Sequence, residues 1–283
     1  MAKVAVLGTG LLGSGMAQNL LAKGNSVRVW NRSAQKLQPL VQLGATAARD
    51  PADAVRGAER VHLVLAEDDA VDAVVAALRP GLGDSVPLVD HSTNLPARVE
   101  RRTQQLRAAG VRYLSAPVFM SPQNARDASG MILLAGPKDE CDALQPVLAT
   151  MTRKVWYVGE RSDLAAHHKL AGNGLLLALT GVMGDLLAMG AARGLSPQDV
   201  LSLFEVWMPG TPMGMFGQRV ATAGDTAASF ELTMARKDLR LMLDTAGRQE
   251  LSVLPAVAAA MDRAIARGLG ARDFAVYARV ERR

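Results

Sequence analysis

The chain has 283 residues, of which 49% are hydrophobic and 21% are charged, so it can bury a sizeable core and is not a disordered protein. Its single cysteine, Cys141, excludes an intramolecular disulfide, fits a reducing cytoplasm and is expected to be a small apolar residue on a helix. The formal net charge is +5, but the basic residues are scattered without interleaved aromatics, so we expect no nucleic-acid partner.

The first strand signal starts at Val4, directly after the N-terminal Met1-Ala2-Lys3, and no signal-peptide pattern precedes it. The longest apolar stretch, residues 174–192, is interrupted by Thr180, Asp185 and several glycines. We therefore expect this stretch to be a buried helix rather than a membrane span, and the protein to be cytoplasmic.

The first 160 residues alternate short β-branched runs with amphipathic Ala/Leu segments. Strands are predicted at 4–7, 27–30, 61–65, 87–90, 112–115, 131–135 and 155–158. Helical patterns lie between most of them, at 17–22, 70–78, 96–108 and 139–149. This alternation is typical of an α/β domain with a largely parallel sheet and helices on both faces, and we assign it to residues 1–160.

The alternation stops near residue 160. A helical pattern over 162–193 ends at Gly194, and Ser196-Pro197 then forms a new helix start. Further helices are predicted at 196–205, 232–250 and 255–267, and 208–214 is expected to be a loop or a broken helix start. The sequence thus predicts a long connecting helix at the boundary and an all-helical domain over residues 161–283.

The first strand and helix are joined by Gly8-Thr9-Gly10-Leu11-Leu12-Gly13, a GxGxxG loop. The first glycine allows a tight turn, the second lets the backbone approach a pyrophosphate, and the third lets the helix pack closely on the strand. Free N–H groups at the helix start would hold the phosphates. The order strand, loop and helix predicts a Rossmann-type, doubly wound dinucleotide-binding domain, with a chance group of turn glycines as the alternative.

The end of the second strand, where NAD sites place a carboxylate that binds the adenine ribose, carries Asn31-Arg32-Ser33 instead. A carboxylate would repel a 2′-phosphate, whereas a guanidinium can hold it in a fork. We therefore expect NADP(H) to be preferred over NAD(H). The alternative is that Arg32 is a surface residue and that the choice of cofactor is made elsewhere.

Lys169 and Asn173 are four residues apart in the long helix and so share one face. A lysine among apolar neighbours in a cleft suits general acid/base work on a hydroxyl or carbonyl, and the Asn173 amide could hold the substrate oxygen. Taken alone, such a pair is more often a solvated face. The neighbouring His167 and His168 lack metal-ligand spacing, so no metal is assigned.

Together, five ordered motifs resemble the β-hydroxyacid dehydrogenase family, the relatives of 3-hydroxyisobutyrate dehydrogenase and 6-phosphogluconate dehydrogenase. They are the opening 8–20 with Asn31-Arg32-Ser33, the DxSTxxP segment 90–96, Ala116-Pro117-Val118, Lys169 with Asn173, and Phe230 with Lys237-Asp238-Leu239. The resemblance implies that Thr93 lies near the nicotinamide ribose, that Lys169 is catalytic and that Lys237 approaches the cofactor. Leu65 is also assigned to the cofactor site. A homodimer that packs through 174–192 is implied as well, with a helix buried within the chain as the alternative.

The chain departs from the family after Pro117, where a Ser-Gly-Gly that holds the substrate carboxylate is usual. Phe119-Met120-Ser121 stands there instead, so a small polar cradle has become bulky and apolar. Ser121 and Asn124 are the remaining candidates for substrate contacts. Asp163, Ala165 and Gly172 also replace residues that are usual around the catalytic lysine.

We expect an NADPH-dependent oxidoreductase that interconverts a hydroxyl and a carbonyl on a small substrate of the hydroxy acid or semialdehyde type. Lys169 would be the general acid/base and Asn173 would position the reacting oxygen, while Thr93 and Lys237 hold the nicotinamide end. One alternative is an imine reductase, but those enzymes typically have Asp or Tyr where this chain has Lys169. The other alternative is a non-catalytic NADPH-binding module.

Overall fold

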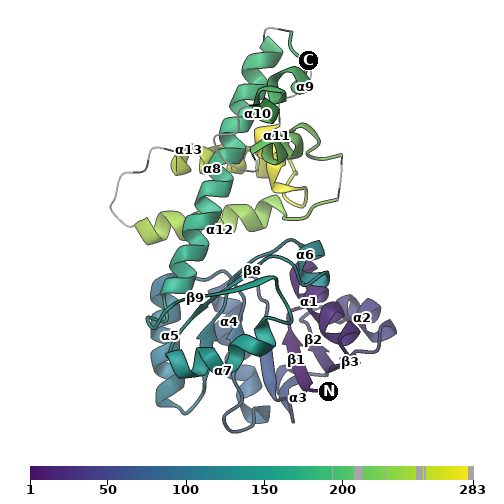
Figure 1. Ribbon diagram of the computed structural model, residues 1–283, viewed down its shortest axis with the longest axis vertical. Coiled ribbons are helices and arrows are strands. Elements are labelled where there is room, and N and C mark those ends of the chain that lie inside the picture. Colours follow the sequence, from purple (N-terminus) through teal and green to yellow (C-terminus); the bar gives the residue numbers. More distant parts are fainter. Residues whose placement is uncertain (193, 207–212, 226, 247–250, 252, 280–283) are drawn as a thin grey trace. The chain divides into compact units, whose positions relative to one another are not determined.

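The computed structural model describes all residues except 193, 207–212, 226, 247–250, 252 and 280–283 (Figure 1). Contacts divide the chain into two compact units, Met1–Lys169 and Leu170–Arg283. The division falls inside a single helix.

The first unit is built on a nine-stranded sheet with the order β3-β2-β1-β4-β5-β6-β8-β7, in which β9 also pairs with β8. The strands are β1 (Lys3–Leu7), β2 (Ser26–Trp30), β3 (Thr46–Ala47), β4 (Arg60–Leu63), β5 (Leu88–Asp90), β6 (Tyr113–Ser115), β7 (Val118–Phe119), β8 (Met131–Ala135) and β9 (Lys154–Gly159). All pairs from β3 to β6 are parallel, as is β8 with β9, whereas β8 runs antiparallel to β6 and β7. The predicted doubly wound α/β fold is confirmed, and the two strands that the sequence did not predict, β3 and β7, have two residues each.

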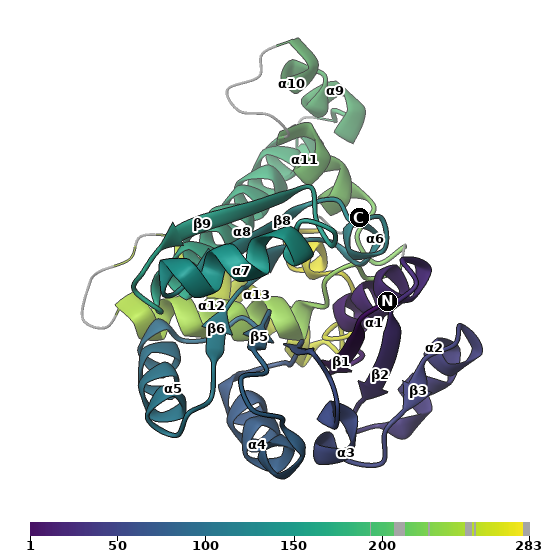
Figure 2. The same ribbon diagram turned by 60° about the horizontal axis from the view of Figure 1, so that its bottom comes forward.

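Helices cover both faces of this sheet (Figure 2). They are α1 (Leu11–Ala22), α2 (Gln38–Gln42), α3 (Pro51–Val55), α4 (Asp68–Leu78), α5 (Pro96–Ala108), α6 (Pro122–Arg126) and α7 (Lys138–Leu148), with the 3₁₀ turns η1 (Ala34–Leu37) and η2 (Arg79–Gly81). Alternate residues of β1 face opposite layers: Val4 and Val6 pack with α1, α2, α6 and α7, and Ala5 and Leu7 pack with α3, α4 and α5. Both faces of the strand are therefore buried, which explains its continuous apolar run.

The predicted strand 61–65 ends two residues early, at Leu63. The N–H of Val64 still donates to the carbonyl oxygen of Leu7 at 2.9 Å, but the N–H of Leu65 donates to the Ser92 hydroxyl at 2.9 Å. Cys141 is buried on α7, as expected, and this burial raises the pKa of its thiol to about 12.

The long helix α8 (Leu164–Ala192) begins in the first unit, where Ala165 and Ala166 are buried against the sheet, and continues into the second. In the second unit Leu177, Met183 and Leu187 are buried, but Leu175 is 62% exposed and Val182 is 44% exposed. The prediction of a buried helix is therefore correct for one face only. None of the described helices combines the length and the apolarity that crossing a membrane requires.

Among its described residues the second unit contains helices but no strand, and Glu231 and Asp273 form one isolated bridge. The helices after α8 are α9 (Pro197–Leu201), α10 (Leu203–Val206), α11 (Met213–Ala221), α12 (Leu232–Ala246) and α13 (Leu254–Ala266), followed by the 3₁₀ turn η3 (Phe274–Ala278). The predicted all-helical character is confirmed for these residues. Most of the predicted loop 208–214 and the end of the predicted helix 232–250 lie outside the described residues.

The predicted helix start at Ser196-Pro197 is present, because Ser196 and Asp199 cap α9 reciprocally. The predicted single helix 196–205 is, however, broken between α9 and α10. At the break the hydroxyl of Ser202 donates to the carbonyl oxygen of Asp199 at 2.8 Å, a local bond that competes with helix continuation.

Candidate functional site

The glycine loop between β1 and α1 is closely packed at Gly8 and Gly13 and open at Gly10. Gly8 has φ +98°, and a Cβ atom there would lie 2.1 Å from the carbonyl oxygen of Val64. A Cβ on Gly13 would lie 1.9 Å from the carbonyl oxygen of Gly8. A Cβ on Gly10 would meet no atom within 4 Å, and no side chain caps the α1 N-terminus that follows. The loop thus presents uncapped helix N–H groups beside an open position, the arrangement that a diphosphate requires.

Thr9 and Asn31 join this loop to the end of β2. The backbone N–H of Thr9 donates to Asn31 Oδ1 at 3.1 Å, and Asn31 Nδ2 donates to the carbonyl oxygen of Ser33 at 3.1 Å. The Thr9 hydroxyl is buried and has no hydrogen-bond partner within the described chain. A buried hydroxyl in this state is costly unless another group completes its bonding, so it fits a loop that takes a polar ligand. The Arg32 side chain that follows Asn31 is exposed.

Leu65 lies against the same loop. Its Cδ2 atom would be 3.0 Å from a Cβ on Gly8, and its N–H bonds the Ser92 hydroxyl. The structure therefore places Leu65 next to the glycine loop and Ser92, the residue before Thr93, next to Leu65. The cofactor contacts expected of Leu65 and Thr93 stay a prediction.

The Asp90 carboxylate organises the turn that contains Thr93. It accepts hydrogen bonds from Ser92 N at 2.9 Å, from Asn94 Nδ2 at 2.8 Å and from the Tyr113 hydroxyl at 2.6 Å. Burial, with the Asp90 carboxylate beside it, raises the pKa of Tyr113 well above its usual value, so the phenol stays a donor at neutral pH. Hydrogen bonds among buried polar groups therefore fix the conformation of this turn.

A second buried chain of polar groups runs from Arg60 to Ala116. Arg60 Nε donates to His62 Nε2 at 3.1 Å, His62 Nδ1 lies 2.8 Å from His91 Nε2, and His91 Nδ1 lies 2.7 Å from the carbonyl oxygen of Ala116. Since a guanidinium only donates, His62 must accept on Nε2 and donate from Nδ1, and His91 must then donate to Ala116. Burial lowers the pKa of both imidazoles, which agrees with neutral tautomers. The sequence analysis missed this chain, although charged and imidazole side chains in a strand buried on both faces were a signal.

The segment after Pro117 forms β7 and then α6. Ser121 and Asn124 are engaged in the start of α6, because Ser121 Oγ accepts from Asn124 N at 3.1 Å and Asn124 Oδ1 accepts from Ser121 N at 2.9 Å. Asn124 Nδ2 also donates to Ser129 Oγ at 2.9 Å. The substrate contacts expected of these two side chains stay a prediction. Their capping role was readable from Ser121-Pro122, a Ser followed by Pro at the first helical position.

This segment is fixed beside the glycine loop through contacts of α6 with α1. A Cβ on Gly15 would lie 2.8 Å from the carbonyl oxygen of Pro122 and 3.0 Å from the Cβ of Ala125. Asn19 Nδ2 donates to the carbonyl oxygen of Arg126 at 2.8 Å. The predicted phosphate loop and the predicted substrate segment are therefore neighbours within one unit.

Lys169, at the end of the first unit, points at the substrate segment. Its Nζ lies 4.4 Å from the centroid of the Phe119 ring, within the range of a cation–π contact. His168 instead packs edge-on against Trp156 with ring centroids 5.4 Å apart, and its Nδ1 donates to the carbonyl oxygen of Leu164 at 2.8 Å. No group of three metal-ligating side chains occurs among the residues that the structure describes.

In the second unit Asn173 and Lys237 meet at one carboxylate. Asn173 Nδ2 donates to Asp238 Oδ2 at 2.6 Å, and Lys237 Nζ lies 2.6 Å from Asp238 Oδ1. Asn173 and Asp238 are both buried. Asp238 stands in one of the five motifs without a predicted role, and in the structure it bonds α8 to α12 through Asn173.

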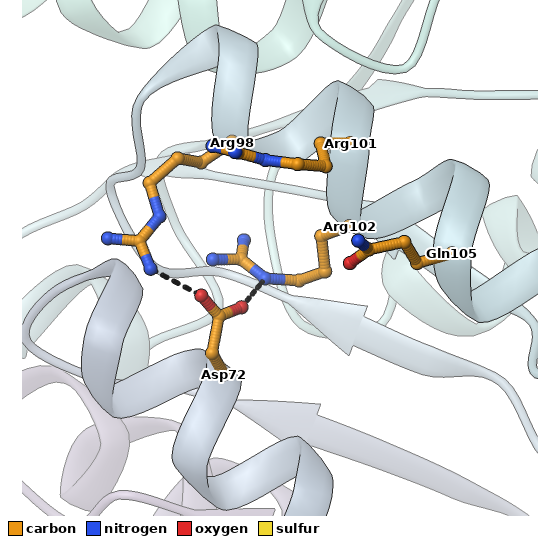
Figure 3. A pocket seen from close by; sticks show the side chains of 5 residues that line it. All are labelled: Asp72, Arg98, Arg101, Arg102 and Gln105. Carbon is orange, nitrogen blue, oxygen red and sulfur yellow. Dashed lines mark hydrogen bonds and ion pairs between the residues drawn. The ribbon is translucent and has the colours of Figure 1, made fainter.

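A separate pocket of about 460 Å³ lies between α4 and α5 (Figure 3). It is lined by Asp72, Arg98, Arg101, Arg102 and Gln105. Partial burial disfavours the Asp72 carboxylate, but hydrogen bonds and positive charge from Arg102 and Arg98 outweigh this and lower its pKa. Arg102 also donates to the buried Asp68 at 2.8 Å. These ion pairs join the two helices, and none of the predicted site residues lines the pocket.

A family model described as the NAD binding domain of 6-phosphogluconate dehydrogenase matches residues 3–159, more than half of the chain. The chain belongs to the β-hydroxyacid dehydrogenase family. The resemblance predicted from the five motifs is therefore confirmed. Members of the family are NAD(P)-dependent oxidoreductases acting on hydroxyl groups, and this chain is an enzyme of that class.

Related proteins of known name match over nearly the whole chain. The 3-sulfolactaldehyde reductase of Escherichia coli (strain K12) is 28% identical over 285 residues, which cover 97% of this chain and 94% of that protein. The 3-hydroxyisobutyrate dehydrogenase of Mycobacterium tuberculosis, solved with L-serine, is similar with a TM-score of 0.84 at 20% identity over 98% of both chains. An imine reductase from Pseudomonas sp. is similar with a TM-score of 0.69 at 23% identity, again over 98% of both chains. At these identities the two solved structures show a shared fold.

Proposed function

We propose that this β-hydroxyacid dehydrogenase relative is an NADPH-dependent enzyme that interconverts a hydroxyl and a carbonyl on a small substrate. The observation that carries the proposal is the position of the Lys169 ammonium, 4.4 Å from the Phe119 ring centroid. The ammonium, a proton donor, thus lies beside the segment that follows Pro117. Through α6 this segment packs on α1, the helix after the glycine loop.

The residues of the first unit fit a bound dinucleotide, because Gly10 is open and the buried Thr9 hydroxyl lacks a partner in the chain. Gly8, Thr9, Gly10, Leu11, Leu12 and Gly13 would hold the diphosphate, Asn31, Arg32 and Ser33 the adenine ribose and its 2′-phosphate, and Leu65, Thr93 and Lys237 the nicotinamide end. The exposed guanidinium of Arg32 and the absence of a carboxylate at positions 31–33 support NADP(H) over NAD(H). When bound, the cofactor supplies the hydride.

Lys169 would move the proton of the reaction. In the reductive direction its ammonium donates a proton to the oxygen of the substrate carbonyl as that oxygen becomes a hydroxyl. In the oxidative direction the neutral amine accepts the hydroxyl proton. Asn173, which Asp238 holds by a 2.6 Å hydrogen bond, would position the reacting oxygen, and Ser121 and Asn124 stay candidates for contacts at the rim.

The test is Lys169→Ala in the purified full chain, with NADPH oxidation followed on a panel of semialdehydes and keto acids. We expect a loss of about 10²- to 10⁴-fold in kcat, which is typical of removing a general acid. NADPH affinity, measured by fluorescence titration, should stay within about twofold. Lys154→Ala, which changes an exposed lysine of β9, is the matched control and should keep the wild-type rate. Unchanged turnover in Lys169→Ala would refute the proposed mechanism.

Two other functions can be separated in the same assay. The shared fold of the imine reductase makes a cyclic imine the informative extra substrate, and faster turnover of that imine than of every carbonyl would favour the second function. Binding of NADPH without turnover of any substrate would favour a non-catalytic module. The presence of a proton donor, Lys169, favours the carbonyl reaction over imine reduction and over a non-catalytic role.

We also propose a homodimer that packs through α8 of the second unit. Leu175, which is 62% exposed, and Val182, which is 44% exposed, are seven residues apart and so share one face of the helix. Exposed apolar side chains in such a row are typical of an interface. The single buried cysteine supports action in a reducing compartment such as the cytoplasm.

A further inference from the structure

We propose that Phe119 determines the substrate class of this enzyme and directs it to substrates with an uncharged, apolar group near the reacting carbonyl instead of a carboxylate. The inference rests on the proposed role of Lys169 as the proton donor. It concerns only what surrounds that lysine.

The Phe119 side chain is held in place by the sheet. Phe119 pairs with Met131 across the antiparallel β7–β8 ladder, and its partly buried side chain packs against a cluster that contains Leu133 and Ala165. Lys169 extends from α8 to the face of this ring, with 4.4 Å between Nζ and the ring centroid. One side of the ammonium is therefore covered by an aromatic face.

The polar side chains on the Phe119 segment cap α6. Ser121 Oγ accepts from Asn124 N, Asn124 Oδ1 accepts from Ser121 N, and Asn124 Nδ2 donates to Ser129 Oγ, so the helix start orients both side chains. Met120, the next residue, packs in the opposite layer, where a Cβ on Gly130 would be 2.8 Å from Met120 Cγ. Beside Lys169 the segment thus offers the Phe119 ring, which has no donor for a carboxylate.

These surroundings disfavour a substrate carboxylate for two reasons. A carboxylate that loses water without gaining hydrogen bonds is strongly disfavoured. The face of an aromatic ring is also negative, so it attracts the Lys169 ammonium but repels an anion placed on it. An apolar substituent, in contrast, gains from contact with Phe119.

The experiment compares succinic semialdehyde with its methyl ester, which has the same chain length but no charge. For the wild-type enzyme we expect kcat/KM to be at least about tenfold higher for the ester, a ratio within the reach of one pocket contact. In Phe119→Ser the ratio should fall about tenfold or invert, because a hydroxyl replaces the ring. In Phe119→Leu the preference for the ester should persist, because the site stays apolar.

A wild-type preference for the acid overturns the inference, and so does a Phe119→Ser variant that binds NADPH normally but keeps the wild-type ratio. The wild-type comparison remains decisive if Phe119→Ser fails to fold. Both results are distinct from failure of the proposed function, which would appear as turnover that survives Lys169→Ala. If neither aldehyde nor any other carbonyl is reduced, the proposed function fails and the inference fails with it.

Discussion

The glycine loop leads into α1, and the segment after Pro117 packs on α1 through α6, but different constraints shape the two regions. At Gly8 and Gly13 the backbone itself sets the residue type, because any Cβ would fall within about 2 Å of a carbonyl oxygen. After Pro117 the backbone makes a short strand and a capped helix that accept Phe119 and Met120 without strain. The residue types of the glycine loop are therefore tied to the fold, whereas the side chains proposed to meet the substrate can change while the fold is kept. This difference explains how one chain can retain the glycine loop and carry Phe119-Met120 after Pro117.

The largest expected effect comes from adding a methyl group at either of two glycines of the loop, one packed and one open. In Gly13→Ala the new Cβ meets the Gly8 carbonyl oxygen, so we expect the free energy of unfolding to fall by about 1–3 kcal/mol and NADPH affinity to fall with it. In Gly10→Ala the Cβ points into open space from a backbone with φ −67°, so stability should change by less than about 0.5 kcal/mol while NADPH binding weakens. Urea unfolding and fluorescence titration measure the two effects. Equal stability of the two variants would contradict the packing argument.

A second prediction concerns the preference for NADPH over NADH. Arg32→Ala removes the guanidinium proposed to bind the 2′-phosphate, so NADPH affinity should fall about 10- to 100-fold, the size expected for a charged hydrogen-bonded contact. NADH affinity should stay within about twofold, since NADH has no 2′-phosphate. Arg126→Ala, which changes an exposed arginine of α6, serves as the control. An equal loss for both cofactors would assign Arg32 to a general electrostatic role.

A third prediction concerns the buried chain that runs from Arg60 through His62 and His91 to the Ala116 carbonyl. Burial lowers the pKa of both imidazoles in the folded chain, so below a pH of about 6.5 the unfolded chain binds protons that the folded chain does not. Stability is then fully present above that pH and falls as the pH decreases, by up to about 1.4 kcal/mol per pH unit for each histidine.

Urea unfolding between pH 8 and pH 5 measures this slope. The double variant His62→Gln/His91→Gln should be less stable at pH 8 but show a flatter dependence on pH, since an amide does not titrate in this range. A slope in the double variant as steep as in the wild type would assign the pH dependence to other groups.

Local patterns in the sequence determined the fold class and most of its elements. Short β-branched runs, the GxGxxG loop and the Ser196-Pro197 helix start depend on neighbours a few residues away, and the structure contains the strands, the strand–loop–helix order and the helix start. The two-residue strands β3 and β7 escaped prediction because such short segments carry almost no periodic signal. The break between α9 and α10 also escaped prediction, and the Ser202 hydroxyl bonds the Asp199 carbonyl there.

Contacts between distant residues required the tertiary structure. His62 and His91 are 29 residues apart, and Asn173 and Asp238 are 65 apart, so no spacing rule indicates that they meet. The same holds for the substitution at Phe119, which the sequence showed as a departure from the family pattern, while only the folded chain places its ring against Lys169. The physical reason is that a turn, a cap or a strand is selected by energies within a short segment. The surroundings of a catalytic group are selected by how the sheet and helices pack.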